Sequence, residues 1–326
     1  MISIITPTHK PCVLLDLTIK SVLTQTYDDF EWVVLDNSQE GYFENYLNDF
    51  FLNNPHLEYR RDKIKIHHKL CEDYNIGRLK NECVSLTNCG EDEYVLLLDH
   101  DDFLNPRLLE YVHDLEVRYP LAQFINGDNV TLEYDIQKET FGWYCWKTGL
   151  YYEDLLKDES SIKWVSKDVN INIDDVNINF GYCTEYTLRY FDFYPVSTNM
   201  MEVLKKETGS SLHHRIACHP RIIKKHVLKN KYFAFYEGHQ ISEDMVQCTL
   251  IGHFLKGCYI PHDTIYNIRY ADCSNTSAMY NDDNMKDIEI LEQYLIDFIV
   301  NLRKLFPNLE PLETKILNYE EIKDCD

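Results

Sequence analysis

The sequence predicts an α/β protein with a mostly parallel central sheet flanked by helices. Short apolar segments alternate with amphipathic ones in the first half of the chain, which is typical of parallel sheets. Three of the apolar segments end in polar or acidic residues, at Thr6 and Pro7, at Asp36 and at Asp99. Because strands of a parallel sheet end at one edge, and such sheets bind ligands there, this edge is the expected site.

The first three elements are expected to be a strand, a helix and a second strand. Residues 2–6 (ISIIT) form a short apolar segment, as in a buried strand. Residues 13–26 carry apolar side chains at helical spacing, namely Leu15, Ile19, Val22 and Leu23. Residues 31–36 (EWVVLD) predict the second strand, and the polar residues Asn37 and Ser38 follow it directly.

The next elements continue this alternation up to about residue 135. They are, in chain order, a third strand within 57–68, a short helix at 77–87, a strand at 94–98, a helix after Asn105 and Pro106, and a strand or hairpin edge at 122–135. Asn105 is suited to cap the helix that follows it, and Pro106 to occupy the first turn of that helix. The buried side of the same helix is predicted to consist of Leu108, Leu109, Val112 and Leu115.

Two later segments differ in pattern from the first half. Residues 136–210 show no repeating pattern but are rich in aromatic residues: Trp143, Tyr144, Trp146, Tyr151, Tyr152 and Trp164. These rings either cover the sheet edge, where a sugar can stack, or form a small satellite core. Residues 282–306 predict a long helix from the spacing of Ile288, Leu291, Leu295, Phe298, Leu302 and Leu305.

Charge and cysteine content limit the classes of partner. The formal net charge of -22 repels nucleic acid and anionic lipid, so neither is an expected partner. Eleven cysteines without a CxxC pair favour a reducing, cytoplasmic setting. The first residues do not resemble a secretory signal, and no apolar segment is long enough for a transmembrane anchor, so a soluble protein is expected.

Three carboxylates within four positions follow the strand at 94–98. Such carboxylates repel one another unless a cation or hydrogen-bond donors lie between them. Alternation places Asp99 and Asp101 on the same side, where two carboxylates suit a divalent cation with oxygen ligands, Mg²⁺ or Mn²⁺. The alternative is a solvated acidic turn in which Asp102 or Asn105 caps the next helix.

A second acidic pair, Glu243 and Asp244, follows Ser242 near the expected start of a helix. Acidic residues are favoured in a first helical turn, so a purely structural role is one interpretation. In the other, one of the two carboxylates is a general base that accepts a proton from a hydroxyl nucleophile.

Several basic residues are candidates for contact with a diphosphate or, individually, for ordinary surface charges. They are Arg221, Lys224, Lys225 and Arg269. His219 and His262 are candidate metal ligands, although a single histidine without a spaced partner carries little weight.

Taken together, the segments resemble the family 2 glycosyltransferases with the A-type fold. The resemblance lies in the order and spacing of six segments: SIITPTHKP, SVLTQTYDDFEWVVLDNS, GRLKNECV, YVLLLDHDDFLNP, ISEDMVQCTLIGHFLKGCYIP and YNIRYADCSNTS. The resemblance implies a nucleotide-sugar-binding half at 1–135, followed by an inserted cover on the acceptor side at 136–210. Residues 211–280 would return to the same domain and carry the catalytic base and the loop that closes over the donor. Residues 281–326 would form a C-terminal helix and an acidic tail.

The resemblance also implies a role for each matching residue. Thr6, Pro7 and His9 would meet the nucleoside, Asp36 the base, commonly uracil, and Arg78 with Asn81 the segment that crosses the nucleotide. Asp99 would approach the ribose or the metal, Asp101 would bind the cation, Asp244 of the Glu243-Asp244 pair would be the catalytic base, and Arg269 would belong to a loop that closes over the donor.

The implied activity is metal-dependent transfer of one sugar from a UDP-linked donor, with inversion, to a glycan or glycoprotein acceptor. His100 departs from the small or apolar residue usual between the aspartates, and no Gln-x-x-Arg-Trp motif follows the base, which argues against a processive polysaccharide synthase. The C-terminal helix could pack on the domain or form a homodimer.

Two other functions compete with this interpretation. A sugar-phosphate nucleotidyltransferase should have an early glycine-rich phosphate loop, and TPTHKPCVLL contains no glycine. A catalytically inactive nucleotide- or carbohydrate-binding module would keep the fold without turnover, and Asp99, Asp101 and Asp244 argue against it.

Overall fold

The computed structural model describes the sheet, its helices and the edge at which the strands end. The described residues are 1–9, 14–38, 41–70, 75–135, 140–144, 221–231, 233–235, 237, 247, 251, 255 and 257–270. The predicted aromatic segment beyond residue 144, the Glu243-Asp244 pair and the C-terminal helix lie outside these residues.

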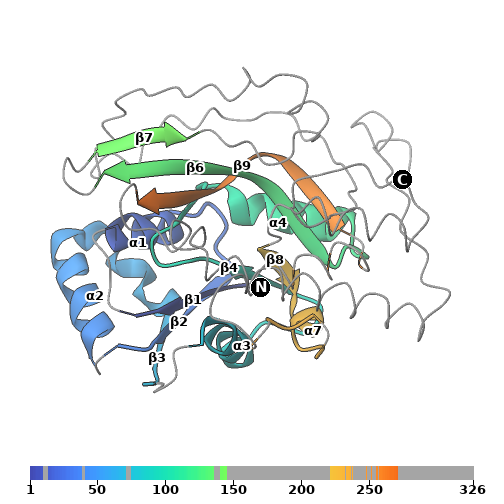
Figure 1. The fold of residues 1–326 in the computed structure, drawn as a ribbon, viewed down its shortest axis with the longest axis horizontal. Helices are drawn as coiled ribbons and strands as arrows, with labels where there is room; N and C mark the ends of the chain where they lie inside the picture. Colours follow the sequence, from blue (N-terminus) through green and yellow to red (C-terminus); the bar gives the residue numbers. More distant parts are fainter. Residues whose placement is uncertain are drawn as a thin grey trace, which may run out of the picture.

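The first half of the chain forms the parallel part of the sheet (Figure 1). Strands β1 (Ile2–Thr8), β2 (Phe30–Asp36), β3 (Ile64–His68) and β4 (Tyr94–Leu97) lie in the order β3-β2-β1-β4, with every pairing parallel. The predicted fold class, a largely parallel sheet flanked by helices, is confirmed for this part of the chain.

Beyond β4 the sheet continues with strands of mixed direction. Strand β8 (Ile222–Lys224) pairs antiparallel with β4 and joins it to β6 (Phe124–Asp135), which pairs in parallel with β9 (Gly257–Tyr270). The short β5 (Phe103–Leu104) and β7 (Thr140–Tyr144) pair with β9 and β6. Residues from both sides of the aromatic segment therefore belong to one sheet.

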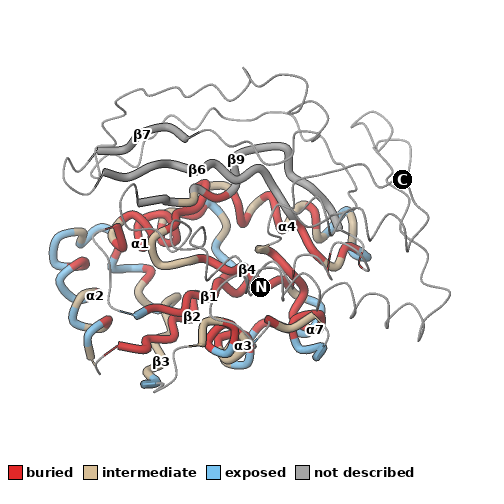
Figure 2. The backbone as a smooth tube through the Cα atoms, viewed as in Figure 1, coloured by how far each residue is buried: buried red, intermediate tan, exposed pale blue. Residues whose placement is uncertain are grey.

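Helices cover both faces of the parallel strands, as the buried tube in Figure 2 shows. Helices α1 (Leu15–Leu23), α2 (Tyr42–Asn53) and α4 (Leu108–Arg118) pack on one face. Helices α3 (Ile76–Leu86) and α7 (Lys225–Leu228) pack on the other.

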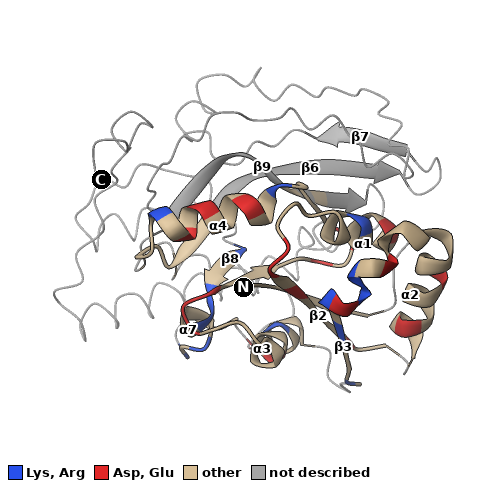
Figure 3. Cartoon of the chain, turned by 180° about the vertical axis from the view of Figure 1, so that it is seen from behind, with Lys and Arg blue, Asp and Glu red and all other residues tan. Residues whose placement is uncertain are grey.

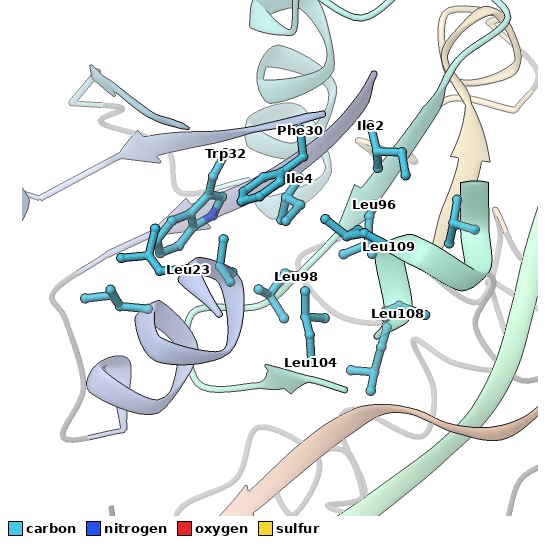
Figure 4. Packing of buried hydrophobic residues seen from close by; sticks show 14 of the residues in the cluster. Ile2, Ile4, Leu23, Phe30, Trp32, Leu96, Leu98, Leu104, Leu108 and Leu109 are labelled. Atoms are coloured by element: carbon cyan, nitrogen blue, oxygen red, sulfur yellow. The ribbon is translucent and has the colours of Figure 1, made fainter. Parts of the chain in front are cut away.

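The core on the α1 face shows how alternation assigns side chains to the two layers. Ile2 and Ile4 of β1 belong to one cluster with Trp32, Leu23 and Leu109, and all five are fully buried (Figure 4). Ile5, one residue on, belongs to the cluster on the α3 face. Because successive side chains of β1 point to opposite faces of the sheet, this strand contributes to both layers of the core.

Two elements were not predicted from the sequence, helix α2 and the 3-10 helix before β3. Phe43, Leu47, Phe50 and Phe51 are buried at helical spacing, and this signal was present in the sequence. Gly41, with φ of 78°, provides the left-handed turn before the helix. The segment predicted as a strand within 57–68 begins instead as a 3-10 helix, Pro55–Lys63, and only its last five residues are β3.

Asn105 does not cap α4 directly. Its side-chain oxygen accepts a hydrogen bond from the Arg107 N–H at 2.9 Å, and the helix begins at Leu108. Asn105 therefore forms a local turn that leads into the helix. The four predicted apolar residues of α4 are buried, as expected.

None of the helices in the described ranges is long and apolar enough to cross a bilayer.

Cys83 and Cys89 are free and buried, and burial raises the pKa of the Cys83 thiol. That thiol is therefore protonated at neutral pH and packs as a small apolar group.

A buried carboxylate on β2 ties three segments together. Glu31 has 3% of its side chain exposed and accepts hydrogen bonds from the Ser3 hydroxyl at 2.6 Å, the Asn88 N–H at 2.5 Å and the Lys65 ammonium. Burial alone would raise the pKa of this carboxyl, but its three donors together lower the pKa below the ordinary value of 4.5.

We expect Glu31→Gln to lower the free energy of unfolding by about 1–3 kcal/mol at neutral pH, because a charged hydrogen-bonded group is lost. Since the pKa of Glu31 is lowered on folding, this difference is complete above pH 4.5 and shrinks as the pH falls through the folded-state pKa. Urea unfolding at several pH values measures it, with the half-exposed Glu58→Gln as control. An equal difference at pH 3 and pH 7 would contradict the assignment.

Candidate functional site

The ends of the parallel strands form one connected edge. The Asn37 N–H after β2 donates to the Thr8 carbonyl at 2.8 Å, and the Lys69 N–H after β3 donates to the Asp36 carbonyl at 2.9 Å. The imidazole of His9 lies 2.8 Å from the Asn37 carbonyl. These bonds fix the loop after β2 against both neighbouring strands.

Asp36 is fully buried at this edge and its carboxylate is bonded to the chain. One carboxylate oxygen accepts from the N–H and hydroxyl of Ser38, and the other accepts from the Phe43 N–H at 3.3 Å, in the first turn of α2. Asp36 therefore joins the loop after β2 to a helix N-terminus, where a negative charge is favourable.

The predicted first-strand residues divide into core and edge. Thr6 is fully buried and accepts a hydrogen bond from the Trp32 indole N–H at 2.9 Å, so its side chain belongs to the core. Pro7 is also buried, whereas His9 is exposed. Thr8, which the sequence analysis passed over, is 3% exposed, and its hydroxyl has no hydrogen-bond partner within the described ranges.

The acidic turn, defined here as residues 99–102, follows β4 and is held by contacts from other elements. Its own backbone closes through the Asp102 N–H, which donates to the Asp99 carbonyl at 3.1 Å. Thr18 on α1 donates its hydroxyl to the His100 carbonyl at 2.9 Å. The turn is therefore braced by α1 rather than being a free surface loop.

The positive group expected beside these carboxylates is Arg221. One guanidinium nitrogen, Nη1, lies 3.1 Å from Asp99 Oδ2 and 2.7 Å from Asp102 Oδ2, and the Arg221 side chain is 12% exposed. The interpretation of Arg221, Lys224 and Lys225 as surface charges is wrong, because both lysines are buried as well.

The two lysines have structural partners instead of a ligand. Lys224 donates to the Pro120 carbonyl at 2.6 Å, and Lys225 donates to the carbonyls of Thr87 and Cys89 at 2.8 and 3.0 Å. They attach β8 and α7 to the loops around them.

The surroundings of Asp101 disfavour its charged form. Burial, and secondarily the nearby Asp99 carboxylate, raise the pKa of Asp101 to about 7. Two such carboxylates fit a divalent cation with oxygen ligands. Among the described residues no group of three or more acidic, histidine or cysteine ligands occurs.

Arg78 and Asn81 lie on α3 beside the segment at 233–237. Asn81 accepts from the Phe235 N–H and donates to the Phe235 carbonyl, both at 2.8 Å, and it also donates to the Glu237 carboxylate. Arg78 is half-exposed and lies 3.7 Å from the Glu237 carboxylate. Asn81 thus anchors a neighbouring segment, while Arg78 remains accessible.

Strand β9 separates the two other predicted residues. Phe103 pairs antiparallel with Tyr266, so Arg269 lies toward the acidic turn and His262 lies away from it. The role of His262 as a metal ligand stays a prediction.

The Glu243-Asp244 pair lies outside the described residues, but a residue shortly after it is placed. Gln247 is helical and buried, and its amide donates to the Phe233 carbonyl at 3.1 Å. Ile251 and Leu255 follow at helical spacing and belong to the core on the α3 face.

Basic residues of the described part do not gather into a single stripe. In Figure 3 they are scattered among acidic residues, with both signs present along α4. The best-defined concentration of charge at the strand ends is the acidic turn with Arg221.

Comparison with known proteins identifies the first half of the chain. Residues 3–161 match the model of a protein family described as Glycosyl transferase family 2. The chain contains a family 2 glycosyltransferase domain. The match includes β1 to β7 and the whole acidic turn, and it confirms the resemblance found in the sequence.

Solved structures that are similar to this chain share little sequence identity with it. No curated protein matches the chain. S. aureus TarS 1-349 in complex with UDP-GlcNAc is 14% identical, with a TM-score of 0.47 over 87% of this chain and 63% of that one. Mannosyltransferase PcManGT from Pyrobaculum calidifontis, in complex with GDP-Man and Mn²⁺, is 17% identical, with a TM-score of 0.29 over 38% of this chain and 34% of that one. The chain thus spans less than two thirds of these proteins.

Proposed function

We propose that this protein transfers a single sugar from a nucleotide-sugar donor, UDP-linked, to a hydroxyl of a glycan or glycoprotein acceptor, with inversion at the anomeric carbon. The observation that supports this most is the acidic turn of a family 2 domain at the end of β4, beside the ends of β1 and β2. A ligand held there would meet side chains from three strands.

The donor is proposed to lie along this edge with its nucleoside toward β1 and β2 and its diphosphate toward the turn. Thr8 offers a buried hydroxyl and His9 an exposed imidazole on the nucleoside side. Asp36 fixes the loop after β2 and so shapes the nucleoside side. Arg78 and Arg269 supply positive charge for the nucleotide from α3 and β9.

Asp99 and Asp101 are proposed to hold Mn²⁺ or Mg²⁺. When bound, such a cation neutralises charge that develops on the nucleoside diphosphate as it leaves. Burial and the neighbouring Asp99 carboxylate raise the pKa of Asp101, and a bound cation would offset both effects, which supports this role. Asp99 lies two residues away and has 36% of its side chain exposed, so it remains open to solvent.

Asp244 is proposed as the general base. It would accept the proton of the acceptor hydroxyl while that oxygen bonds to the anomeric carbon and the bond from that carbon to the diphosphate breaks. Glu243 is the neighbouring candidate for the same role. Gln247, three positions after Asp244, is anchored in the core, which gives this segment a fixed point.

Calorimetric titration with a panel of UDP- and GDP-sugars tests the donor site. Each nucleotide sugar is added with Mn²⁺ and again after EDTA. Metal-dependent binding of one UDP-sugar is expected, and the α or β configuration of the transferred sugar in the product then tests inversion. Folded protein that binds none of them in Mn²⁺ would reject the proposal, whereas binding without transfer to any acceptor would favour an inactive module.

A further inference from the structure

Arg221 divides its charge between two carboxylates that differ in their access to solvent. Asp102 has 5% of its side chain exposed, so its contact with Arg221 at 2.7 Å is a buried ion pair. Asp99 has 36% exposed, and its contact at 3.1 Å lies on the open side of the turn. The first pair is structural, and the second involves a proposed cation ligand.

The position of Arg221 is set by the sheet rather than by a flexible loop. Its carbonyl accepts a hydrogen bond from the Leu97 N–H at 2.7 Å, and the next residue, Ile222, pairs with Leu96. The backbone of Arg221 is therefore attached to β4 just before the acidic turn. A cation approaching Asp99 meets a carboxylate that is already paired and a positive charge that is held in place.

Charge balance then makes cation binding depend on a second negative ligand. With its three carboxylates ionised, the turn and Arg221 together have a formal charge of −2. A free divalent cation would be attracted by the carboxylates but repelled by the guanidinium of Arg221. A diphosphate supplies both further oxygen ligands and negative charge that offsets the guanidinium.

We propose that Arg221 competes with the divalent cation for Asp99, so that the acidic turn holds the cation strongly only together with a nucleotide diphosphate. The role of the nucleotide in this inference rests on the proposed function. The competition between Arg221 and the cation does not depend on it. Arg221 acts through Asp99 and is a positioning residue. By reciprocity, the cation strengthens nucleotide binding by the factor by which the nucleotide strengthens cation binding.

Mn²⁺ titration of the full chain, followed by electron paramagnetic resonance, tests the competition with and without UDP. We expect Arg221→Gln to bind free Mn²⁺ roughly tenfold more tightly than the wild type, because the competing charge is gone. The factor by which UDP strengthens Mn²⁺ binding is expected to fall correspondingly. A merely structural role predicts the opposite sign, since a damaged turn binds Mn²⁺ more weakly.

A double variant covers the case in which Arg221→Gln does not fold because Asp102 is left unpaired. Arg221→Gln with Asp102→Asn keeps the formal charge of −2 and removes the competitor together with its buried partner carboxylate. Arg107→Gln is the matched control, because Arg107 pairs with Glu110 on α4. The double variant should bind free Mn²⁺ more tightly, and the control should not.

Unchanged, weaker or absent free Mn²⁺ binding in a folded double variant would overturn the competition. This measurement needs no nucleotide, so it is separate from the test of function. If the double variant gains Mn²⁺ affinity but UDP has no effect on any form, the competition stands and the nucleotide coupling, with the proposed function, fails.

Discussion

Asp101→Asn is expected to weaken metal-dependent donor binding at least ~100-fold and to remove detectable transfer, because it deletes a charged ligand of the proposed cation. The change keeps the shape of the side chain and lowers the repulsion within the turn. Since burial and Asp99 raise the pKa of Asp101, removing its charge should leave folding stability unchanged or slightly higher. Calorimetry with Mn²⁺ and a UDP-sugar, together with thermal unfolding, measures both.

Asp92→Asn is the matched control for this variant. Asp92 precedes the same strand, and its side chain is 90% exposed beside His226. The Asp92→Asn variant should bind the donor as the wild type does. Retained metal-dependent binding in Asp101→Asn would show that the turn is a structural acidic loop, the alternative that its sequence also allowed.

Asp244→Asn is expected to lower the rate of transfer by about 10²–10⁴-fold, because the acceptor hydroxyl loses its general base. Donor binding and its metal dependence should persist, since the change lies outside the acidic turn. Turnover at saturating donor and acceptor, compared with calorimetric donor affinity, separates the two effects.

Glu243→Gln is the natural comparison, because it alters the neighbouring carboxylate in the same way. A large loss in Glu243→Gln and a small one in Asp244→Asn would transfer the role of base to Glu243. Loss of donor binding in Asp244→Asn would instead indicate a structural residue, as the preference for acids in a first helical turn allows.

The parallel half of the fold could be predicted because its signals are local. Each of β1, β2 and β4 is a continuous apolar segment, and the α1 and α4 patterns repeat at helical spacing. Helix α2 carries the same kind of local signal at Phe43 and Leu47, so this helix too could be predicted from the sequence.

The partners of charged residues could not be predicted, since they depend on contacts between distant parts of the chain. Arg221 and Asp102 are 119 residues apart, and nothing in the sequence indicates that they pair. The end of the first apolar segment indicated Thr6 as an edge residue, although its hydroxyl is bonded within the core.

The position of β8 has a consequence for how the chain acquires its fold. This strand lies between β4 and β6, yet its residues follow β6 by nearly ninety positions and fall outside the span matched by the family. During synthesis, the parallel strands emerge first with the edge of β4 still unpaired, and an open strand edge favours association with other chains. Completion of the sheet therefore waits for residues 222–224, and a chain interrupted before them would expose the strand that leads into the acidic turn.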